Sequence, residues 1–399
     1  MAPLSLSSSS LTFETFTPNT FPLSDNDDDL YSTKTYDIDD HHESNYHQTM
    51  DIFNDFPDLS IDLSNILFIS LLMILIIISM IILYYVNVVR KLLLKKMMAI
   101  SDDNEEDLNG KTIVITGSNE GIGAIVTKIL ANMGARIILL CRDMDKARRI
   151  VGDILAENPI AELSIHHIDL SSQSSIRICV NEILQLEKRI DCLINCASVA
   201  FIPGIEPTKS IDGFELHMAI NYYGPFLLIQ LLNERMKQTA KQYETIGKVI
   251  NVTSILHRYG KIHLADLNLD KSNNYTPFRA YCQSRLALML VGREMARQWK
   301  QSQIHIYNVD PGFSMTRSHY QNLYPICRKI LSIFGWLIGF RSNLKAAQRI
   351  VQCVIDKKFA RHSGYYYRNG RHTIPSERVM DDRLAKNLWT HTITVCNLS

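Results

Sequence analysis

Two side chains in the second half of the sequence are of types that could act on a reacting oxygen. Ser254 ends an apolar, strand-like run, and Tyr281 lies at the start of a helix-like segment that continues into Leu286-Ala-Leu-Met-Leu. Reduction of a carbonyl, or the reverse oxidation of an alcohol, needs one group that hydrogen-bonds the oxygen and another that transfers a proton. The hydroxyl of Ser254 fits the first role, and the phenol of Tyr281 fits the second.

A phenol exchanges a proton poorly near neutral pH, because its unperturbed pKa is about 10. A cation close by favours the ionised form. Arg285 follows Tyr281 by one helical turn, so its charge lies on the same face of the expected helix. Taken alone, Ser254 could cap a strand and Tyr281 could be a half-buried helix residue. Asn221, in Ala219-Ile-Asn-Tyr-Tyr-Gly, could be a helix amide bonded to backbone.

A glycine-rich segment ahead of these residues predicts where a cofactor would bind. Residues 112–116 form a short β-branched run, and Gly117, Gly121 and Gly123 then lead without a break into apolar residues at helical spacing. Such a strand, tight turn and helix open a nucleotide-binding unit, because glycines let the backbone approach a pyrophosphate whose charge the helix N-terminus attracts. The spacing is G-x-x-x-G-x-G, and a plain structural turn is the alternative interpretation.

The type of nucleotide is indicated by the residue after the second expected strand. Arg142 follows the run 136–141 and stands 19 positions past Gly123, where this fold presents its contact to the adenosine ribose. A carboxylate there would bind the 2′-hydroxyl of NAD, whereas a guanidinium suits the 2′-phosphate of NADP. Because Arg142 precedes Asp143, NADP(H) is favoured over NAD(H). Asp169, after the third strand, could lie near the adenine or cap the next helix.

From residue 111 the chain alternates strand-like and helix-like runs. This alternation, which contains no internal repeat, predicts one α/β domain over residues 111–399, with a doubly wound parallel sheet of the Rossmann type. The expected strands lie near residues 112–116, 136–141, 163–168, 191–195, 247–253 and 304–309.

The N-terminal part of the chain has a different composition. Residues 1–62 are rich in Ser, Thr, Asn and Asp without a hydrophobic period, so they read as a disordered acidic tail. Residues 63–89 include a long uncharged run dominated by Ile and Leu, which is enough to cross a hydrocarbon layer of about 30 Å. We therefore expect one transmembrane helix there, followed over residues 90–110 by a linker that is first basic and then acidic.

Charge asymmetry predicts the topology of this membrane protein. Residues 1–89 carry a net charge of −12 and the remainder carries +13, although the whole chain is +1. By the positive-inside rule, basic residues directly after the apolar helix place the C-terminal domain in the cytosol and the acidic tail in the lumen or outside. We expect a single-pass protein of the endoplasmic reticulum. The basic residues are Arg90, Lys91, Lys95 and Lys96.

Other binding classes receive little support from the sequence. All eight cysteines lie beyond residue 110 and none forms a C-x-x-C pair, which predicts reduced thiols in a cytosolic domain. His41, His42 and His47 read as part of a solvated polar tract, so no metal is expected. Nothing indicates a nucleic-acid partner, and association as a homodimer stays open.

Together these motifs resemble the short-chain dehydrogenase/reductase family, and within it the membrane-anchored retinol dehydrogenases. The resemblance covers roughly residues 108–399. It implies an NADP(H) cofactor, hydride transfer to or from C4 of the nicotinamide, and an apolar alcohol or carbonyl substrate of the retinoid, sterol or fatty-aldehyde kind. The similar segments are Thr116-Gly-Ser-Asn-Glu-Gly-Ile-Gly, Asn195-Cys-Ala-Ser, Asp266-Leu-Asn-Leu, Ala280-Tyr-Cys-Gln-Ser, Asp310-Pro-Gly-Phe-Ser-Met-Thr and Ser363-Gly-Tyr-Tyr-Tyr.

The resemblance also implies roles for individual residues. The catalytic tetrad of the family falls on Asn221, Ser254, Tyr281 and Arg285. The implied cofactor contacts are Gly117, Ser118, Gly121, Ile122, Gly123, Arg142, Asp169, Leu170, Asn195, Ala197, Tyr281, Arg285, Pro311, Gly312 and Thr316.

At one position of the tetrad this sequence departs from the family, which has Lys where this chain has Arg285. Arginine keeps the positive charge but is longer, planar and effectively never gives up a proton. Two hypotheses follow: a working but impaired or specialised oxidoreductase, or a catalytically weak relative that binds nucleotide and acts as an interaction protein. A further apolar run, residues 331–340, could be a lid, a strip dipping into the membrane, or core.

Overall fold

The computed structural model describes residues 63–98, 107–202, 204, 206–271, 275–312, 342–359 and 362–398. The chain divides into two compact units, Met1–Val88 and Val89–Ser399, and each is described here by itself. The predicted tail of residues 1–62, most of the acidic linker, the apolar run 331–340 and Thr316 lie outside the described residues.

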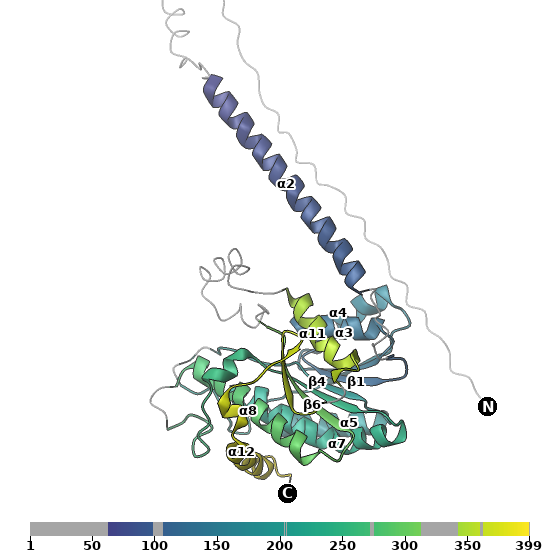
Figure 1. Cartoon of the computed structure of the whole chain (residues 1–399), viewed down its shortest axis with the longest axis vertical. Helices are drawn as coiled ribbons and strands as arrows, with labels where there is room; N and C mark the ends of the chain where they lie inside the picture. Colours follow the sequence, from purple (N-terminus) through teal and green to yellow (C-terminus); the bar gives the residue numbers. More distant parts are fainter. Residues whose placement is uncertain are drawn as a thin grey trace, which may run out of the picture. The chain divides into compact units, whose positions relative to one another are not determined.

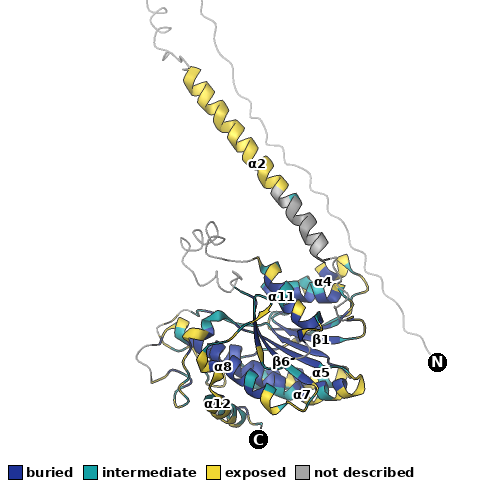
Figure 2. Cartoon of the chain, in the orientation of Figure 1, coloured by how far each residue is buried: buried dark blue, intermediate teal, exposed yellow. Residues whose placement is uncertain are grey.

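The described part of the first unit is formed by the long helix α2 (Leu63–Met98), whose last residues, from Val89 on, are counted with the second unit. Its segment Leu63–Tyr85 has 23 residues with a mean hydropathy of 3.3, and none of its most apolar window is buried (Figure 2). At 1.5 Å per residue this segment is about 34 Å long, which matches the hydrocarbon layer of a bilayer. Its apolar side chains are exposed all around the helix, whereas a helix on the surface of a soluble domain has a polar face.

The second unit is built on an eight-stranded sheet in the order β3-β2-β1-β4-β5-β6-β7-β8. All neighbouring strands are parallel except β7 and β8, which pair antiparallel. The predicted doubly wound sheet is therefore confirmed, and β7 and β8 are additional strands. The bounds are β1 (Thr112–Thr116), β2 (Arg136–Cys141), β3 (Leu163–His167), β4 (Cys192–Asn195), β5 (Gly247–Val252), β6 (Ile304–Asp310), β7 (Tyr365–Arg368) and β8 (Arg371–His372).

Helices cover both faces of the sheet (Figure 1). One face carries α3 (Gly121–Asn132), α4 (Met144–Glu157) and α11 (Asn343–Ile355). The other face carries α5 (Gln173–Leu186), α7 (Gly224–Gln242) and α8 (Pro277–Gln298), with α12 (Asp382–Val395) outside α8. Shorter turns are α6 (Leu216–Met218), the π-helical η1 (Ala219–Tyr223), and the 3-10 turns η2 (Ile255–Tyr259) and η4 (Glu377–Met380).

The residues of strand β1 show why the sheet packs between two layers of helices. Successive side chains of a strand point to opposite faces, and both faces of this sheet are covered, so all five residues of β1 are apolar or β-branched and buried. Val114 joins the core beneath α7, while Ile113 and Ile115 join the core beneath α3. In such a sheet, ligands bind at the carboxyl ends of the strands.

Candidate active site

The turn after β1 requires glycine at three positions. Gly117 and Gly121 have φ angles of 68° and 61°, which side chains disfavour. A Cβ on Gly123 would lie 2.1 Å from the carbonyl oxygen of Gly117. No side chain in the described part of the chain caps the N-terminus of α3, and its first turn has no acidic residue. The N–H groups around Ile122 are therefore available to an anion such as a phosphate.

The segment after β4 lies directly against this turn. The Oγ1 of Thr116 accepts hydrogen bonds from the backbone N–H of Cys196 at 3.1 Å and of Ala197 at 3.2 Å. A Cβ on Gly117 would lie 2.7 Å from the Cα of Ala197. Asn195 is buried and donates through Nδ2 to the Oδ1 of Asn251 at 3.0 Å. Two of the predicted contact segments, which are far apart in the sequence, are thus joined.

The end of β2 presents Arg142 to solvent. The carboxylate of Asp143 accepts from the backbone N–H of Lys146 at 3.0 Å and pairs with its Nζ at 3.1 Å, and these contacts lower the pKa of Asp143. The only carboxylate next to Arg142 in sequence is therefore committed to the start of α4. Ser118 is buried, and its Oγ lies 3.1 Å from the Sγ of Cys141.

Asp169 and Leu170 form the turn between β3 and α5. The Oδ1 of Asp169 accepts hydrogen bonds from the backbone N–H of Ser171 at 2.9 Å and from its hydroxyl at 2.6 Å. Ser172 caps α5, so the alternative interpretation of Asp169 as the cap is wrong. A Cβ on Gly224 would lie 2.4 Å from the carbonyl oxygen of Leu170, which fixes this turn against the start of α7.

The end of β6 leads into Pro311 and Gly312. The φ of Gly312 is 91°, and its backbone N–H donates to the Oδ1 of Asp310 at 2.8 Å. Burial raises the pKa of Asp310, whose Oδ2 also accepts from the hydroxyl of Tyr366 at 3.0 Å. These contacts hold the backbone of the 310–312 turn at the carboxyl edge of the sheet.

Tyr281 and Arg285 lie one turn apart on α8, and each is 4% exposed. The guanidinium carbon of Arg285 lies 5.1 Å from the centroid of the Tyr281 ring, within the range of a cation–π contact. Its Nη1 donates to the backbone carbonyl of Val252 at 3.1 Å. Among the described residues, no carboxylate forms an ion pair with Arg285, and its Nε has no hydrogen-bond partner. A buried, unneutralised positive charge therefore lies beside the phenol.

Ser254 lies two residues beyond the end of β5, where the chain enters η2. Its Oγ accepts a hydrogen bond from the backbone N–H of Leu256 at 3.3 Å. A hydroxyl that accepts in this way keeps its own hydrogen for donation to another oxygen. The carbonyl oxygen of Ser254 lies 2.8 Å from the Nδ1 of His257, a buried residue. Ser254 thus caps a turn and not a strand.

Asn221 is fully buried in the π-helical turn η1. Its Oδ1 accepts from the backbone N–H of Val199 at 2.9 Å, and its Nδ2 donates to the carbonyl of Val199 at 2.9 Å. The same Nδ2 donates to the Oγ of Ser284 at 3.0 Å, and Ser284 donates to the carbonyl of Tyr281 at 2.8 Å. Asn221 therefore joins the loop after β4 to the backbone that carries Tyr281. Insertions of this π type often mark functional sites.

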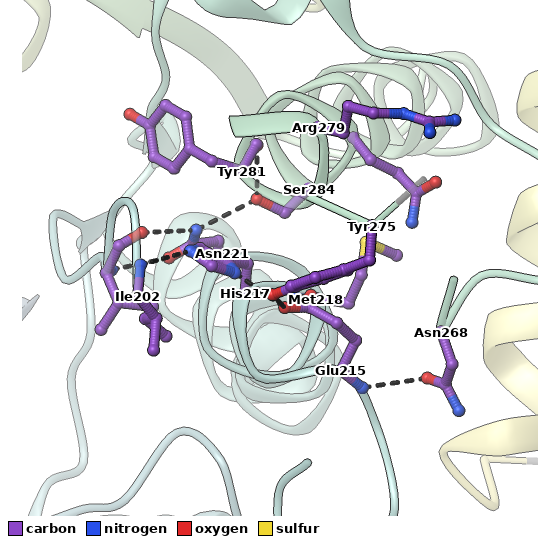
Figure 3. A network of polar contacts seen from close by, with 12 residues as sticks. Ile202, Glu215, His217, Met218, Asn221, Asn268, Tyr275, Arg279, Tyr281 and Ser284 are labelled. Atoms are coloured by element: carbon purple, nitrogen blue, oxygen red, sulfur yellow. Dashed lines mark hydrogen bonds and ion pairs between the residues drawn. The ribbon is translucent and has the colours of Figure 1, made fainter. Parts of the chain in front are cut away.

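The residues that surround Tyr281 on the side of this loop could not be predicted from the sequence. The centroid of the Phe201 ring lies 5.2 Å from that of the Tyr281 ring. The Phe201 and Phe278 rings are stacked, with their centroids 6.3 Å apart. The exposed Tyr259 ring lies 6.0 Å from Phe278, so aromatic surface extends from the phenol to the outside. A buried Glu215–His217 pair also lies beneath the loop (Figure 3). In the sequence this pair is only the triplet Glu-Leu-His shortly before Asn221, which does not by itself predict their contact.

The part of the chain that the structure describes contains no candidate metal-binding site. No three His, Cys, Asp or Glu side chains gather there in a metal-binding arrangement. The seven cysteines in the described ranges are free thiols. Cys196, which faces Arg285, has its pKa raised to about 12, mainly by burial and against the effect of that positive charge.

The doubly wound sheet, the glycine turn and the polar residues at the carboxyl edge define a dinucleotide-binding α/β protein. A family profile described as short chain dehydrogenase matches residues 111–322. Retinol dehydrogenase 12 of Bos taurus is 34% identical over 283 residues, which cover 71% of this chain and 85% of the relative. Retinol dehydrogenase 13 of Mus musculus is 32% identical over 293 residues, which cover 73% and 85%. The chain belongs to the short chain dehydrogenase family.

Solved structures show the same fold. An uncharacterized protein from Mycobacterium paratuberculosis aligns with a TM-score of 0.57 at 25% identity, covering 74% of this chain and 96% of that protein. The Pseudomonas aeruginosa RhlG/NADP active-site complex aligns with a TM-score of 0.53 at 22% identity, covering 66% and 95%.

Proposed function

We propose that this chain is a membrane-anchored oxidoreductase that transfers a hydride between NADP(H) and an apolar alcohol or carbonyl. The observation that carries the proposal is the buried guanidinium of Arg285, whose central carbon lies 5.1 Å from the centroid of the Tyr281 ring. A buried charge is costly unless something compensates it. Its position beside a phenol has a chemical use, because it stabilises negative charge as that charge develops on the phenol oxygen.

The residues at the carboxyl edge fit a dinucleotide. The turn over residues 117–123 has no room for a side chain at Gly117 or Gly123, which favours a backbone that approaches a pyrophosphate at the start of α3. Exposed Arg142 would hold a 2′-phosphate, because Asp143 is committed to Lys146. The remaining implied contacts are Ser118, Asp169 and Leu170 toward the adenosine, and Asn195, Ala197, Pro311 and Gly312 toward the nicotinamide.

Different residues of the chain would then have different roles at the substrate oxygen. The bound cofactor would supply or accept the hydride. Ser254 would donate a hydrogen bond to the substrate oxygen, and Tyr281 would transfer a proton to it in reduction or take one in oxidation. Asn221 would hold the backbone of Tyr281 through Ser284. Arg285 would supply charge without exchanging a proton, so the phenol must be reprotonated by another route.

An apolar substrate is supported by the surface next to Tyr281. The rings of Phe201, Phe278 and Tyr259 form a continuous aromatic wall that leads from the phenol to solvent. Ligand sites are generally lined by such rings, with a few polar groups that fix orientation. Within the proposed class of retinoid, sterol or fatty-aldehyde substrates, the relatives named as retinol dehydrogenases support a retinoid.

We also propose that α2 anchors the protein in the endoplasmic reticulum with the catalytic domain in the cytosol. The support is its exposed apolar segment, Leu63–Tyr85, and the net charge of +13 on residues 90–399. A basic domain is attracted to the anionic cytosolic leaflet. Substrates dissolved in the same membrane would then be within reach.

A second candidate function is a nucleotide-binding interaction protein with weak catalysis. It is favoured by one observation: Arg285 donates to the carbonyl of Val252, which gives the guanidinium a purely structural use. Cofactor binding alone does not separate the two functions, because both predict it. Turnover separates them.

The experiment is NADPH oxidation by the purified full chain in detergent micelles, with all-trans-retinal and with long-chain aldehydes. We expect turnover in the wild type and a loss of roughly 10²- to 10⁴-fold in Tyr281→Phe, since the ring is kept and only the proton donor is lost. The matched control is Tyr243→Phe, whose ring lies under Arg189 at the end of α7 and should leave the rate unchanged. Equal rates in the wild type and Tyr281→Phe would refute the proposal.

A further inference from the structure

Glu215 and His217 form a fully buried pair just ahead of η1. The Nδ1 of His217 lies 2.7 Å from the Oε1 of Glu215, and neither side chain is exposed. Nothing in the proposed reaction uses either residue. Ionisable side chains are rarely buried completely unless they are hydrogen-bonded, so this pair calls for a structural or functional reason.

The hydrogen bonds around His217 determine its tautomer. The backbone N–H of Ile202 donates to the Nε2 of His217 at 3.2 Å (Figure 3). An N–H can only donate, so Nε2 must carry a lone pair and no proton. The ring proton therefore lies on Nδ1 and is donated to Glu215. The histidine is a neutral acceptor for the loop, and the carboxylate orients it.

Glu215 is the centre of this network. Its carboxylate also accepts from the hydroxyl of Tyr275 at 3.3 Å and from the backbone N–H of Met218 at 2.9 Å. Its own backbone N–H donates to the Oδ1 of Asn268 at 2.9 Å. Hydrogen bonds of this kind compensate the burial of an ionised carboxylate. These contacts hold Glu215 from three directions, and Glu215 in turn orients His217.

The loop after β4 is anchored at two points. Asn221 bonds both backbone groups of Val199, and His217 accepts from Ile202. Phe201 lies between these anchors with a φ of 51°, a strained value for a residue other than glycine. Such strain persists only where the surroundings fix the backbone. The result is that the Phe201 ring is held against Tyr281 and Phe278.

We propose that His217 is a positioning residue that fixes Phe201 as the wall of the substrate site and so sets the preference for long apolar substrates. This inference rests on the proposed oxidoreductase function. Without the acceptor at Nε2, the N–H of Ile202 would be unpaired beneath the loop, and Phe201 would lose its fixed position. The chemistry at Tyr281 would continue, but long substrates would bind more weakly.

Two matched variants separate the hydrogen bonds of His217. The amide of His217→Asn occupies the position of Nδ1, so it can donate to Glu215 but leaves Ile202 without an acceptor. The amide of His217→Gln occupies the position of Nε2, so it can accept from Ile202 but leaves Glu215 without its donor. In the full chain in micelles, we expect His217→Asn to raise KM for all-trans-retinal about tenfold with kcat nearly unchanged. His217→Gln should keep the wild-type KM.

A second substrate and a second variant exclude a general loss of folding. A short aldehyde that does not reach Phe201 should show the same KM in all three proteins. Phe201→Ala, which leaves the Glu215 network intact, should raise KM for retinal and not for the short aldehyde. If His217→Asn and His217→Gln shift KM for retinal equally, or if Phe201→Ala leaves it unchanged, the proposal is wrong.

Hydrogen exchange tests the anchor without any turnover. In the full chain, the backbone amide of Ile202 should exchange about fivefold faster in His217→Asn than in the wild type, and at the wild-type rate in His217→Gln. Equal exchange in both variants would overturn the anchoring role. Because this measurement needs no substrate, an inactive wild type would refute the proposed function while the anchor is still tested.

Discussion

The charge next to Tyr281 is the feature of single residues on which the proposed chemistry depends most. Arg285 is buried, contacts the ring of Tyr281 and donates to Val252. A lysine at this position could exchange protons, whereas a guanidinium is effectively always charged. The proposed site therefore retains electrostatic stabilisation and loses one route for proton relay. We therefore expect the reaction to be the same as with a lysine at this position, but slower.

His257 gives a prediction about stability and pH. Burial lowers the pKa of this histidine from 6.5 to about 4 in the folded protein. Between these values the unfolded chain binds a proton that the folded protein does not, so the free energy of unfolding falls as the pH falls. The full contribution, about 3 kcal/mol, is present above the unfolded pKa and is lost as the pH approaches 4.

Urea unfolding of the wild type and His257→Asn, at several pH values between about 4 and 7, checks this. The asparagine amide can still donate to the carbonyl of Ser254, but it does not titrate. We expect the variant to be less stable at neutral pH and less sensitive to acid. An equal loss of stability in both proteins between these pH values would show that His257 is not the group responsible.

Several residues of the candidate site could be predicted from the sequence because their types and spacing are local signals. The one-turn spacing of Tyr281 and Arg285 predicted a shared helix face, and the structure brings the two side chains into contact. Phe201 and the Glu215–His217 pair gave no comparable signal. Their importance comes from contacts between segments that only the fold brings together, such as Ile202 with His217.

Among the elements, the glycine turn between β1 and α3 sets the position of the proposed cofactor site. In Gly123→Ala the added Cβ would lie 2.1 Å from the carbonyl oxygen of Gly117, so the turn must move. We expect NADPH affinity, measured by fluorescence titration, to fall roughly 5- to 150-fold, since overpacking of this kind costs about 1–3 kcal/mol and the displaced turn is the proposed cofactor site.

Gly152→Ala is the matched control for this substitution. Gly152 lies in α4, where nothing among the described residues is within 4 Å of the added Cβ. Replacing a helical glycine by alanine stabilises a helix by about 0.5–1 kcal/mol, so the melting temperature should rise slightly and NADPH affinity should stay constant. An unchanged NADPH affinity in Gly123→Ala would contradict the assignment of this turn.

The elements that sequence reasoning predicted well are the long, regular ones. Six strands were expected from runs of β-branched residues, and they form the parallel sheet. The strands β7 and β8 were missed because their sequences, Tyr-Tyr-Tyr-Arg and Arg-His, contain no aliphatic run, and because they are defined by pairing with β6 and with each other. The π-helical turn η1, which contains Asn221, was not predicted either.

For the whole molecule, the apolar helix predicts attachment to a membrane, and the charge distribution predicts on which side the catalytic domain lies. The full chain should remain in the membrane pellet after alkaline carbonate extraction, and a chain that begins at residue 107 should be released. The catalytic domain of the full chain should be degraded when protease is added to intact microsomes, because the basic residues in the last turns of α2, which follow the apolar segment Leu63–Tyr85, favour the cytosolic side. A protected domain would contradict the proposed orientation while leaving the anchor intact.

The most direct test of the central claim compares NADPH-dependent reduction of all-trans-retinal by the wild type, Arg285→Lys and Arg285→Met in the full chain. If the buried charge of Arg285 assists Tyr281, the wild type turns over and Arg285→Lys stays active. Arg285→Met should lose roughly 10²-fold or more, with NADPH affinity measured separately. A wild type without turnover, together with activity in Arg285→Lys, would show that arginine has abolished the chemistry and would contradict this account.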